Sequence, residues 1–222
     1  MTTEERLAAV FFDVDGVLLD SLPQHLRFCA DKAREYGLAD LRIPTAHEFK
    51  CLILRGVSVS PMLNFFRALG FPEPLAQKGV EDYEREFMSC YRPTLFPGVQ
   101  ILLQKLFEMG LPLGLVTSNT RENVEPALGN AMHFFDKRCL FYYEGLAARK
   151  DKAAHLRLGA EALGVAVRRC CYVGDQPADS VAAQAAGFRF LGVSYGWGFA
   201  ENDSRVSVVN DIQSLALRIL EM

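Results

Sequence analysis

The chain has 222 residues, half of them hydrophobic, and a formal net charge of -3 with no basic cluster. Its length suits one large domain or one domain with a modest insertion. Its charge disfavours nucleic acid as a partner, and no apolar run reaches the roughly 18 residues of a membrane span, so we expect neither nucleic acid nor membrane as a partner. Six scattered cysteines show no Cys-x-x-Cys spacing, which predicts reduced thiols and a cytoplasmic protein.

The first predicted element is a buried strand over residues 7–12, an apolar run that leads into Asp13-Val14-Asp15-Gly16. Side chains two apart on a strand share a face, so Asp13 and Asp15 should project the same way from its end. Two like charges there repel unless a cation or a shared proton compensates them. Gly16 would let backbone approach whatever occupies that space, although an Asp-Gly pair also makes ordinary turns.

Residues 22–92 show helical patterning without a convincing strand. Apolar residues recur there at helical spacing in four stretches, separated by glycines and prolines. Turn-forming residues near 20–23 and 92–97 flank this segment. We therefore expect four short helices inserted directly after the first strand.

Beyond residue 98, predicted helices alternate with short apolar runs. The helices are expected at 99–109, 122–128, 153–163, 179–186 and 211–220, and the strands at 111–116, 139–142, 169–173 and 188–193. Such alternation predicts a parallel sheet with helices on both faces. The expected fold is a doubly wound α/β core of residues 1–21 and 93–222, with a four-helix domain of residues 22–92 inserted into it.

Polar residues follow the ends of several predicted strands, where open α/β sheets bind their ligands. Besides Asp13 and Asp15, they are Thr117, Ser118, Asn119, Lys150, Lys152, Asp175 and Asp179. Taken singly, each stretch could be an ordinary N-cap, a helix terminus or a surface cluster. Together they offer carboxylates, a hydroxyl and a lysine at strand ends that the fold brings together. Hard oxygen ligands of this kind suit Mg²⁺ shared with a substrate phosphate.

Four signatures together resemble those of the haloacid dehalogenase superfamily of phosphohydrolases. They are Asp-x-Asp-Gly-Val-Leu-x-Asp-Ser at 13–21, Thr-Ser-Asn at 117–119, a lysine at 150 or 152, and Gly-Asp-x-x-x-Asp at 174–179. The helical insertion resembles the small cap of the phosphoglycolate phosphatase-like branch. Segments 117–124 and 192–198 are similar to that branch as well.

The resemblance implies a role for each aspartate and for the threonine. Asp13 would be the nucleophile that becomes an aspartyl-phosphate, and Asp15 would protonate the leaving alcohol and later activate water. Thr117 would hydrogen-bond the transferred phosphoryl group. Asp175, with Asp13 and the backbone carbonyl of Asp15, would hold Mg²⁺, and Asp179 would support these ligands.

The resemblance leaves the lysine open. Lys150 fits relatives in which a proline follows the lysine, whereas Lys152 fits relatives whose helix starts without one, and we favour Lys152. Gly16, Ser118 and Asn119 would contact the substrate. In the insertion, Arg55 belongs to a segment that loosely resembles the specificity loop of related caps, or it is a surface arginine.

The expected function is that of a Mg²⁺-dependent phosphatase acting on a small phosphorylated metabolite through a covalent aspartyl-phosphate. Metal and lysine would neutralise developing charge while the carboxylates exchange protons and form the covalent bond. A monomer or homodimer is expected. One alternative is a β-phosphoglucomutase-like phosphotransferase, and another is a non-catalytic regulatory protein on the same fold, which loss of a motif aspartate would favour.

Overall fold

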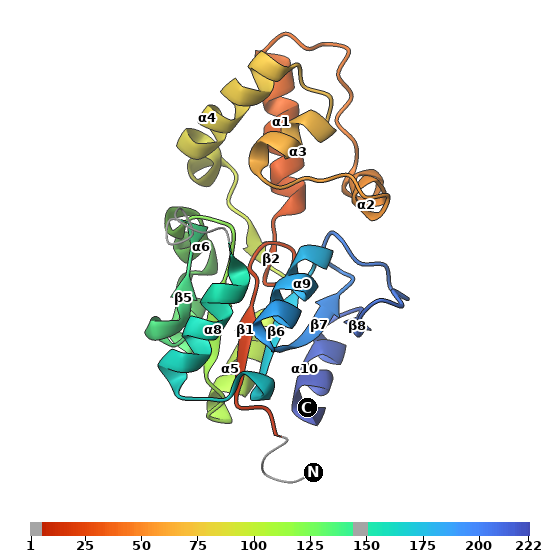
Figure 1. Cartoon of the computed structure of the whole chain (residues 1–222). Helices are drawn as coiled ribbons and strands as arrows, with labels where there is room; N and C mark the ends of the chain where they lie inside the picture. Colours follow the sequence, from red (N-terminus) through yellow and green to blue (C-terminus); the bar gives the residue numbers. More distant parts are fainter. Residues whose placement is uncertain (1–5, 144–150) are drawn as a thin grey trace. The chain divides into compact units, whose positions relative to one another are not determined.

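The computed structural model describes residues 6–143 and 151–222, and the chain falls into two compact units (Figure 1). The first unit comprises Met1–Asp20 and Thr94–Met222, and the second comprises Ser21–Pro93. The insertion expected at 22–92 differs from the second unit by one residue at each end. Within the described residues, no helix has both the length and the apolar character that crossing a membrane requires.

The first unit is built on a six-stranded parallel sheet with β1 (Ala9–Phe12) at its centre. The strand order is β5-β4-β1-β6-β7-β8. The remaining strands are β4 (Leu113–Val116), β5 (Leu140–Phe141), β6 (Cys170–Gly174), β7 (Arg189–Val193) and β8 (Val208–Val209). The chain moves outward from β1 to β5 and then restarts at β6 on the other side of β1. The strand order therefore reverses beside β1, which is where open α/β sheets bind ligands.

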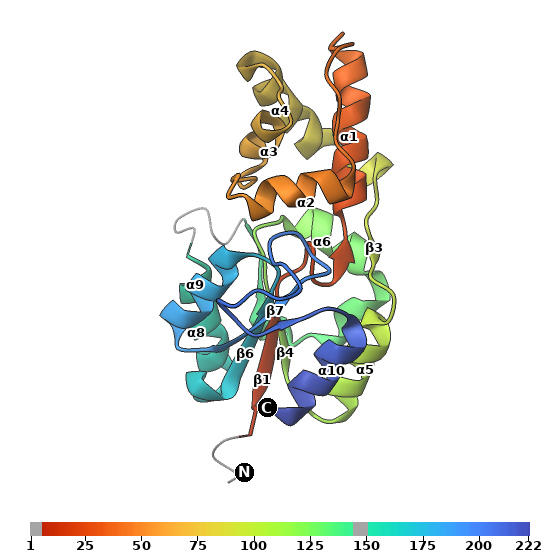
Figure 2. The same cartoon turned by 90° about the vertical axis from the view of Figure 1, so that its right-hand side faces the viewer.

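Helices cover both faces of this sheet (Figure 2). On one face lie α8 (Lys152–Leu163) and α9 (Pro177–Ala186), and on the other lie α5 (Val99–Glu108) and α10 (Ile212–Glu221). The helix α6 (Arg121–Leu128) and the 3₁₀ turns η1 (Gly129–Phe134), η2 (Lys137–Cys139) and η3 (Val167–Arg169) complete the connections. The crossover from β1 to β4, which contains α5, and the crossovers from β5 to β6 and from β6 to β7, which contain α8 and α9, run in opposite directions along the sheet. Because both kinds are right-handed, their helices lie on opposite faces. The predicted doubly wound α/β fold is confirmed.

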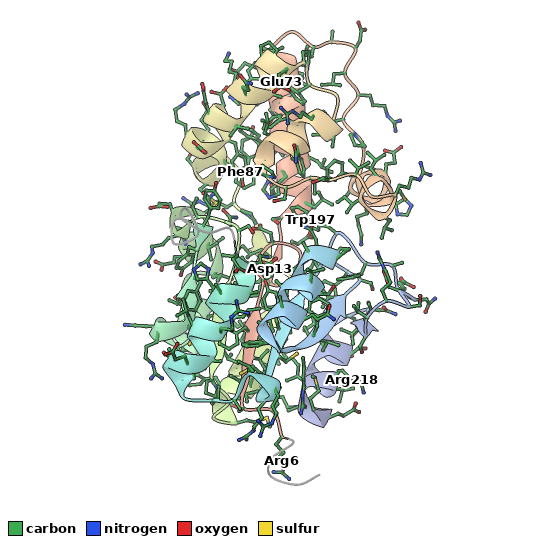
Figure 3. The ribbon with its side chains drawn as sticks, viewed as in Figure 1. Arg6, Asp13, Glu73, Phe87, Trp197 and Arg218 are labelled. Atoms are coloured by element: carbon green, nitrogen blue, oxygen red, sulfur yellow. The ribbon has the colours of Figure 1, made fainter. Side chains whose placement is uncertain are left out.

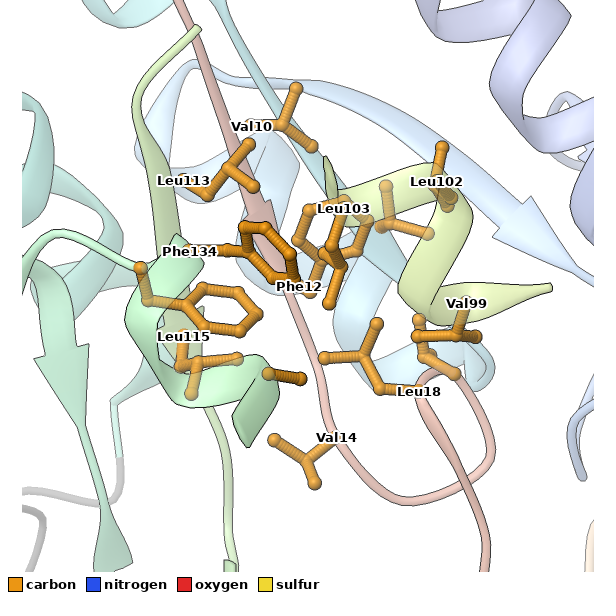
Figure 4. Close-up of a cluster of buried hydrophobic side chains, with 14 of the residues drawn as sticks. Val10, Phe12, Val14, Leu18, Val99, Leu102, Leu103, Leu113, Leu115 and Phe134 are labelled. Carbon is orange, nitrogen blue, oxygen red and sulfur yellow. The ribbon is translucent and has the colours of Figure 1, made fainter. Parts of the chain in front are cut away.

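Alternate residues of β1 supply the two apolar layers of the core. Val10 and Phe12 pack in the layer under α5 and α10, where Leu103 also lies (Figure 4), and Phe11 packs in the layer under α8 and α9. These side chains are fully buried. A strand buried on both faces reads as a continuous apolar run. Its pattern fixes the register, because a slip of one residue would move each side chain to the opposite layer.

A short antiparallel pair lies where the chain leaves and re-enters the first unit. Its strands are β2 (Leu19–Asp20) and β3 (Thr94–Leu95), with Leu19 opposite Leu95. Neither strand was expected from the sequence, because two residues are too few to show a periodicity.

The second unit contains α1 (Leu22–Glu35), α2 (Ala46–Leu54), α3 (Met62–Ala68) and α4 (Glu73–Cys90). Its interior is rich in aromatic rings. The Phe28 ring meets those of Phe66 and Phe87 edge-on, with centroids 6.3 and 5.9 Å apart. Edge-to-face pairs of this kind add to the stability gained from burying the rings.

A buried ionic network also joins α1 to α4. Lys32 Nζ lies 2.6 Å from Glu86 Oε2 and 3.4 Å from Asp82 Oδ2, and the Lys32 and Asp82 side chains are only 6% and 3% exposed. Asp82 also accepts hydrogen bonds from Tyr36 and Arg85. Burial raises the pKa of Asp82, but the hydrogen bonds and the charge of Lys32 outweigh it and hold this pKa below its usual value.

Replacing Lys32 by methionine is expected to lower the free energy of unfolding by about 3 kcal/mol at pH 7, because it removes the buried cation beside Asp82 and leaves this buried carboxylate with only the exposed Arg85 as a cationic partner. Urea titration of both proteins would measure the difference. As a control, Arg67→Ala removes an ion pair with Glu73 in which both side chains are 48% exposed, and it should have a much smaller effect.

The same comparison has a characteristic pH dependence. A carboxylate whose pKa is depressed on folding contributes stability above its unfolded pKa and loses that contribution as the pH falls through its folded pKa. Since the pKa of Asp82 is depressed, the gap between wild-type and Lys32→Met should close below about pH 4. A gap that stayed constant down to pH 2 would contradict the electrostatic explanation.

Candidate active site

Polar side chains gather at the carboxyl ends of β1, β4 and β6. Asp13 directly follows β1, Thr117 follows β4 and Asp175 follows β6, and the three residues are 7%, 1% and 0% exposed. Figure 3 shows Asp13 and Trp197 at this end of the sheet and Arg218 near the opposite end. Buried polar groups are costly unless partners or ligands satisfy them, so this edge is the candidate site.

Three buried carboxylates form the centre of the site. Asp13, Asp175 and Asp179 each offer one oxygen, and these oxygens lie within 4.8 Å of one another. Burial raises the pKa of Asp13 to about 6, although Lys152 acts in the opposite direction. Burial, together with the other two carboxylates, also holds the pKa of Asp175 well above its usual range. A cation among them would favour the ionised forms.

Within residues 6–143 and 151–222, Lys152 supplies the positive charge that contacts this group. Its Nζ lies 2.8 Å from Asp13 Oδ2 and 2.7 Å from Asp179 Oδ1. Lys152 is the first residue of α8, which Asp151 caps by accepting a hydrogen bond from the backbone N–H of Ala153. The helix thus starts without proline, as in the alternative that favoured Lys152. The other candidate, Lys150, lies outside the described residues.

Of the three buried carboxylates, Asp175 is the one best suited to act as a ligand of a cation. Its Oδ2 accepts a 2.7 Å hydrogen bond from the backbone N–H of Trp197, whereas its Oδ1 is buried with no hydrogen-bond partner among the described residues. The neighbouring backbone is close: a Cβ on Gly16, where φ is +77°, would lie 2.1 Å from Asp175 Oδ2, and a Cβ on Gly196 would lie 2.4 Å from Asp175 Cβ. Only glycine fits at these two positions.

Asp179 lies in the first turn of α9. Its Oδ2 accepts a 3.1 Å hydrogen bond from the backbone N–H of Gln176, while its Oδ1 binds Lys152. This carboxylate therefore caps its own helix and fixes the lysine at once. A Cβ at position 174 would come within 2.4 Å of Asp179 Cβ, so Gly174 leaves room for this arrangement.

Asp15 has a different hydrogen-bond partner from the three buried carboxylates. Its Oδ2 accepts a 2.7 Å hydrogen bond from Asn119 Nδ2. The backbone N–H of Asn119 in turn donates to Thr117 Oγ1 at 3.1 Å. Of the other expected substrate-binding residues, Ser118 is exposed in the same loop, and Arg55 is exposed at the end of α2 in the second unit.

Two residues of the site were not expected from the sequence. Tyr172 is fully buried in β6, and its hydroxyl donates to the carbonyl of Val116 at 2.8 Å, while Lys152 Nζ lies 5.8 Å from the centre of its ring. Because Tyr172 lies within an apolar strand, the sequence predicts only that it belongs to the hydrophobic core. The hydrogen bond from the backbone N–H of Trp197 to Asp175 could not be predicted either, because any residue except proline can donate a main-chain N–H.

If Lys152 has the role that the resemblance implies, its replacement by methionine should lower kcat for a phosphate ester by about 10²- to 10³-fold, the usual loss when one group that stabilises transition-state charge is removed. Lys150→Met should cause a much smaller loss. Steady-state kinetics of the two variants, with circular dichroism to check folding, would compare them. The reverse order of the two losses would assign the catalytic lysine to position 150.

Comparisons of the sequence with known proteins identify one family, and a comparison of the structure finds the same fold in a known protein. The family described as haloacid dehalogenase-like hydrolase matches residues 10–193. A phosphoglycolate phosphatase of Xanthomonas campestris pv. campestris (strain 8004) is 30% identical over 201 residues, which cover 88% of this chain and 86% of that protein. One from Yersinia pseudotuberculosis serotype I is 30% identical over 211 residues, covering 90% and 87%. A crystal structure of a predicted phosphoglycolate phosphatase from Haemophilus somnus superposes with a TM-score of 0.76 at 20% identity, covering 99% of each chain.

Proposed function

Because the chain belongs to the haloacid dehalogenase-like hydrolase family, we propose that it hydrolyses a small phosphoric monoester at the carboxyl ends of β1, β4 and β6. The observation that carries the proposal is the contact of Lys152 Nζ with both Asp13 and Asp179, beside the buried Asp175. This is an arrangement of charges suited to a transferring phosphoryl group. The names of the relatives make 2-phosphoglycolate the first ester to test.

In the proposed reaction, a carboxylate oxygen of Asp13 attacks phosphorus while the bond between phosphorus and the ester oxygen breaks. Asp15 gives its proton to that oxygen, so the alcohol leaves and Asp15 becomes a carboxylate. Water then attacks the aspartyl-phosphate and gives a proton to Asp15, which releases inorganic phosphate and restores the Asp13 carboxylate. The net change is hydrolysis of one ester bond by one water.

Two further groups would bind the phosphoryl oxygens. Thr117 Oγ1 accepts the backbone N–H of Asn119, so its own hydroxyl hydrogen remains to be donated. Lys152 would neutralise charge that develops during transfer. Gly16 and Ser118 would line the substrate's path, and Arg55 of the second unit is proposed to contribute to specificity.

Mg²⁺ fits the site, because Asp175 Oδ1 is a buried oxygen with no hydrogen-bond partner in the described part of the chain and two more buried carboxylates lie nearby. Asp13, Asp175 and the backbone carbonyl of Asp15 would hold the ion, with Asp179 in support. When bound, it would offset the negative charge of the phosphate and of the carboxylates.

The test of this function is a panel of phosphate esters, including 2-phosphoglycolate, sugar phosphates and p-nitrophenyl phosphate, assayed with Mg²⁺ by release of inorganic phosphate. An Asp13→Asn protein purified in parallel excludes a contaminating phosphatase. Turnover of at least one ester with stoichiometric phosphate release supports hydrolysis. Return of the phosphoryl group to a sugar hydroxyl would favour the mutase alternative, and no turnover of any ester would overturn the proposal.

Metal removal gives a separate prediction. Activity should vanish in chelator and return with added Mg²⁺, whereas Ca²⁺ should substitute poorly because its larger, looser coordination disturbs the geometry of in-line transfer. The measurement is phosphate release before and after dialysis against chelator and then against each cation. Full activity in excess chelator would contradict the proposed metal site.

A further inference from the structure

The side chain of Asn119 has a defined orientation. Its Oδ1 accepts hydrogen bonds from the backbone N–H of Thr120 at 2.8 Å and from Asn123 Nδ2 at 2.9 Å. A backbone N–H can only donate, so the side of the amide that faces Thr120 must be the oxygen. The amide nitrogen therefore faces Asp15, whose Oδ2 lies 2.7 Å away.

The backbone of Asn119 is anchored as well. Its N–H donates to Thr117 Oγ1 at 3.1 Å, and its carbonyl accepts the N–H of Tyr143 at 2.9 Å. Asn123, which holds the amide oxygen, belongs to α6. A continuous set of hydrogen bonds thus runs from a helix, through one asparagine, to the carboxyl group of Asp15. Such support limits the positions available to that carboxyl group.

We propose that Asn119 is a positioning residue for Asp15, which it orients for proton transfer, and that Asn123 maintains Asn119 in this role. The inference rests on the proposed function. It differs from the expectation from the sequence, in which Asn119 would contact the substrate.

The hydrogen bond also distinguishes the two oxygens of Asp15. Asn119 Nδ2 donates to Oδ2, and in the acid form that the proposed mechanism requires, the oxygen that accepts an N–H is preferentially the carbonyl oxygen, so Oδ1 would be the hydroxyl. The proton for the leaving oxygen then comes from Oδ1, and the same oxygen later receives a proton from water. Removing the Asn119 side chain would remove this hydrogen bond, so a smaller fraction of molecules would hold the carboxyl group in this orientation.

The test uses Asn119→Ala and Asn123→Ala, measured in single turnovers so that formation of the phosphoenzyme is seen apart from its hydrolysis. The rate for 2-phosphoglycolate, or for whichever alkyl ester the panel identifies, should fall by about 10- to 100-fold in Asn119→Ala. The rate for p-nitrophenyl phosphate, which needs little help to leave, should change less than about 3-fold. Asn123→Ala should give a smaller loss of the same kind, and Asn130→Ala, an exposed asparagine of η1, should change neither rate.

A double-mutant cycle separates positioning from a structural effect. If Asn119 acts through Asp15, then adding Asn119→Ala to Asp15→Asn should cause no further loss with the alkyl ester. Additive losses, equal losses with both esters, or a raised KM with unchanged kcat would overturn the positioning role. Absence of phosphoryl transfer to the wild-type protein from any ester would overturn the proposed function itself. A normal wild-type reaction with an unaffected Asn119→Ala variant would overturn only this inference.

Discussion

Replacing Asp13 by asparagine is expected to reduce phosphate release by at least about 10⁴-fold, because the amide cannot act as the nucleophile that accepts the phosphoryl group. Asp13 directly follows β1, is 7% exposed and lies 2.8 Å from Lys152 Nζ. The substitution is isosteric and Lys152 keeps its contact with Asp179, so the fold should be retained. Phosphate release and intact-protein mass spectrometry after an acid quench would measure the turnover and the covalent intermediate.

Controls for this variant come from the same unit. Asp136→Asn changes an aspartate that caps η2 away from the site, and it should leave turnover unchanged. Trp197 is the only tryptophan in the chain and its backbone N–H binds Asp175, so an unchanged emission spectrum would show that the site remains folded. Substantial phosphate release by Asp13→Asn would contradict its assignment as the nucleophile.

The core could be predicted from the sequence where the signal is local. The apolar run before Asp13 is buried on both faces of the sheet, and its composition alone predicted a buried strand over residues 7–12, of which Ala9–Phe12 form β1. The helices expected beyond residue 98 could also be predicted from local patterns, because each begins and ends within two residues of its expected limits. The expected strand at 111–116 is shorter, beginning at Leu113, and the expected start of a strand at 139 was wrong because Cys139 ends η2.

Contacts between distant segments could not be predicted in this way. The hydrogen bond from Asn119 to Asp15 joins residues 104 positions apart, and the residue types alone do not distinguish it from a contact with substrate. The position of Lys152 depends on where α8 begins, and Asp151 caps that end of the helix. The absence of a proline after Lys150 favoured Lys152 but did not reveal the cap. Short strands such as β2 and β8 depend on the neighbours they pair with, and no periodicity marks them.

Replacing Asp15 by asparagine is expected to slow the steps that need proton transfer much more than nucleophilic attack by Asp13. The nucleophile remains, but no proton reaches the leaving oxygen and no base activates water. General acid–base groups contribute about 10²- to 10⁴-fold, so turnover of alkyl phosphates should fall by that range. The measurement is steady-state kinetics on an alkyl ester and on p-nitrophenyl phosphate.

The activated ester should still phosphorylate the Asp15→Asn protein, because p-nitrophenolate needs no proton to leave. The resulting aspartyl-phosphate should then hydrolyse slowly and accumulate, which mass spectrometry would detect as an added phosphate. Asp13 and Asp15 lie at the end of one strand, yet Asp13 contacts Lys152 whereas Asp15 contacts Asn119. These different partners are the physical reason to expect different roles, as in other paired carboxylates. If Asp15→Asn loses activity with every ester while Asp13→Asn keeps it, the two roles are reversed.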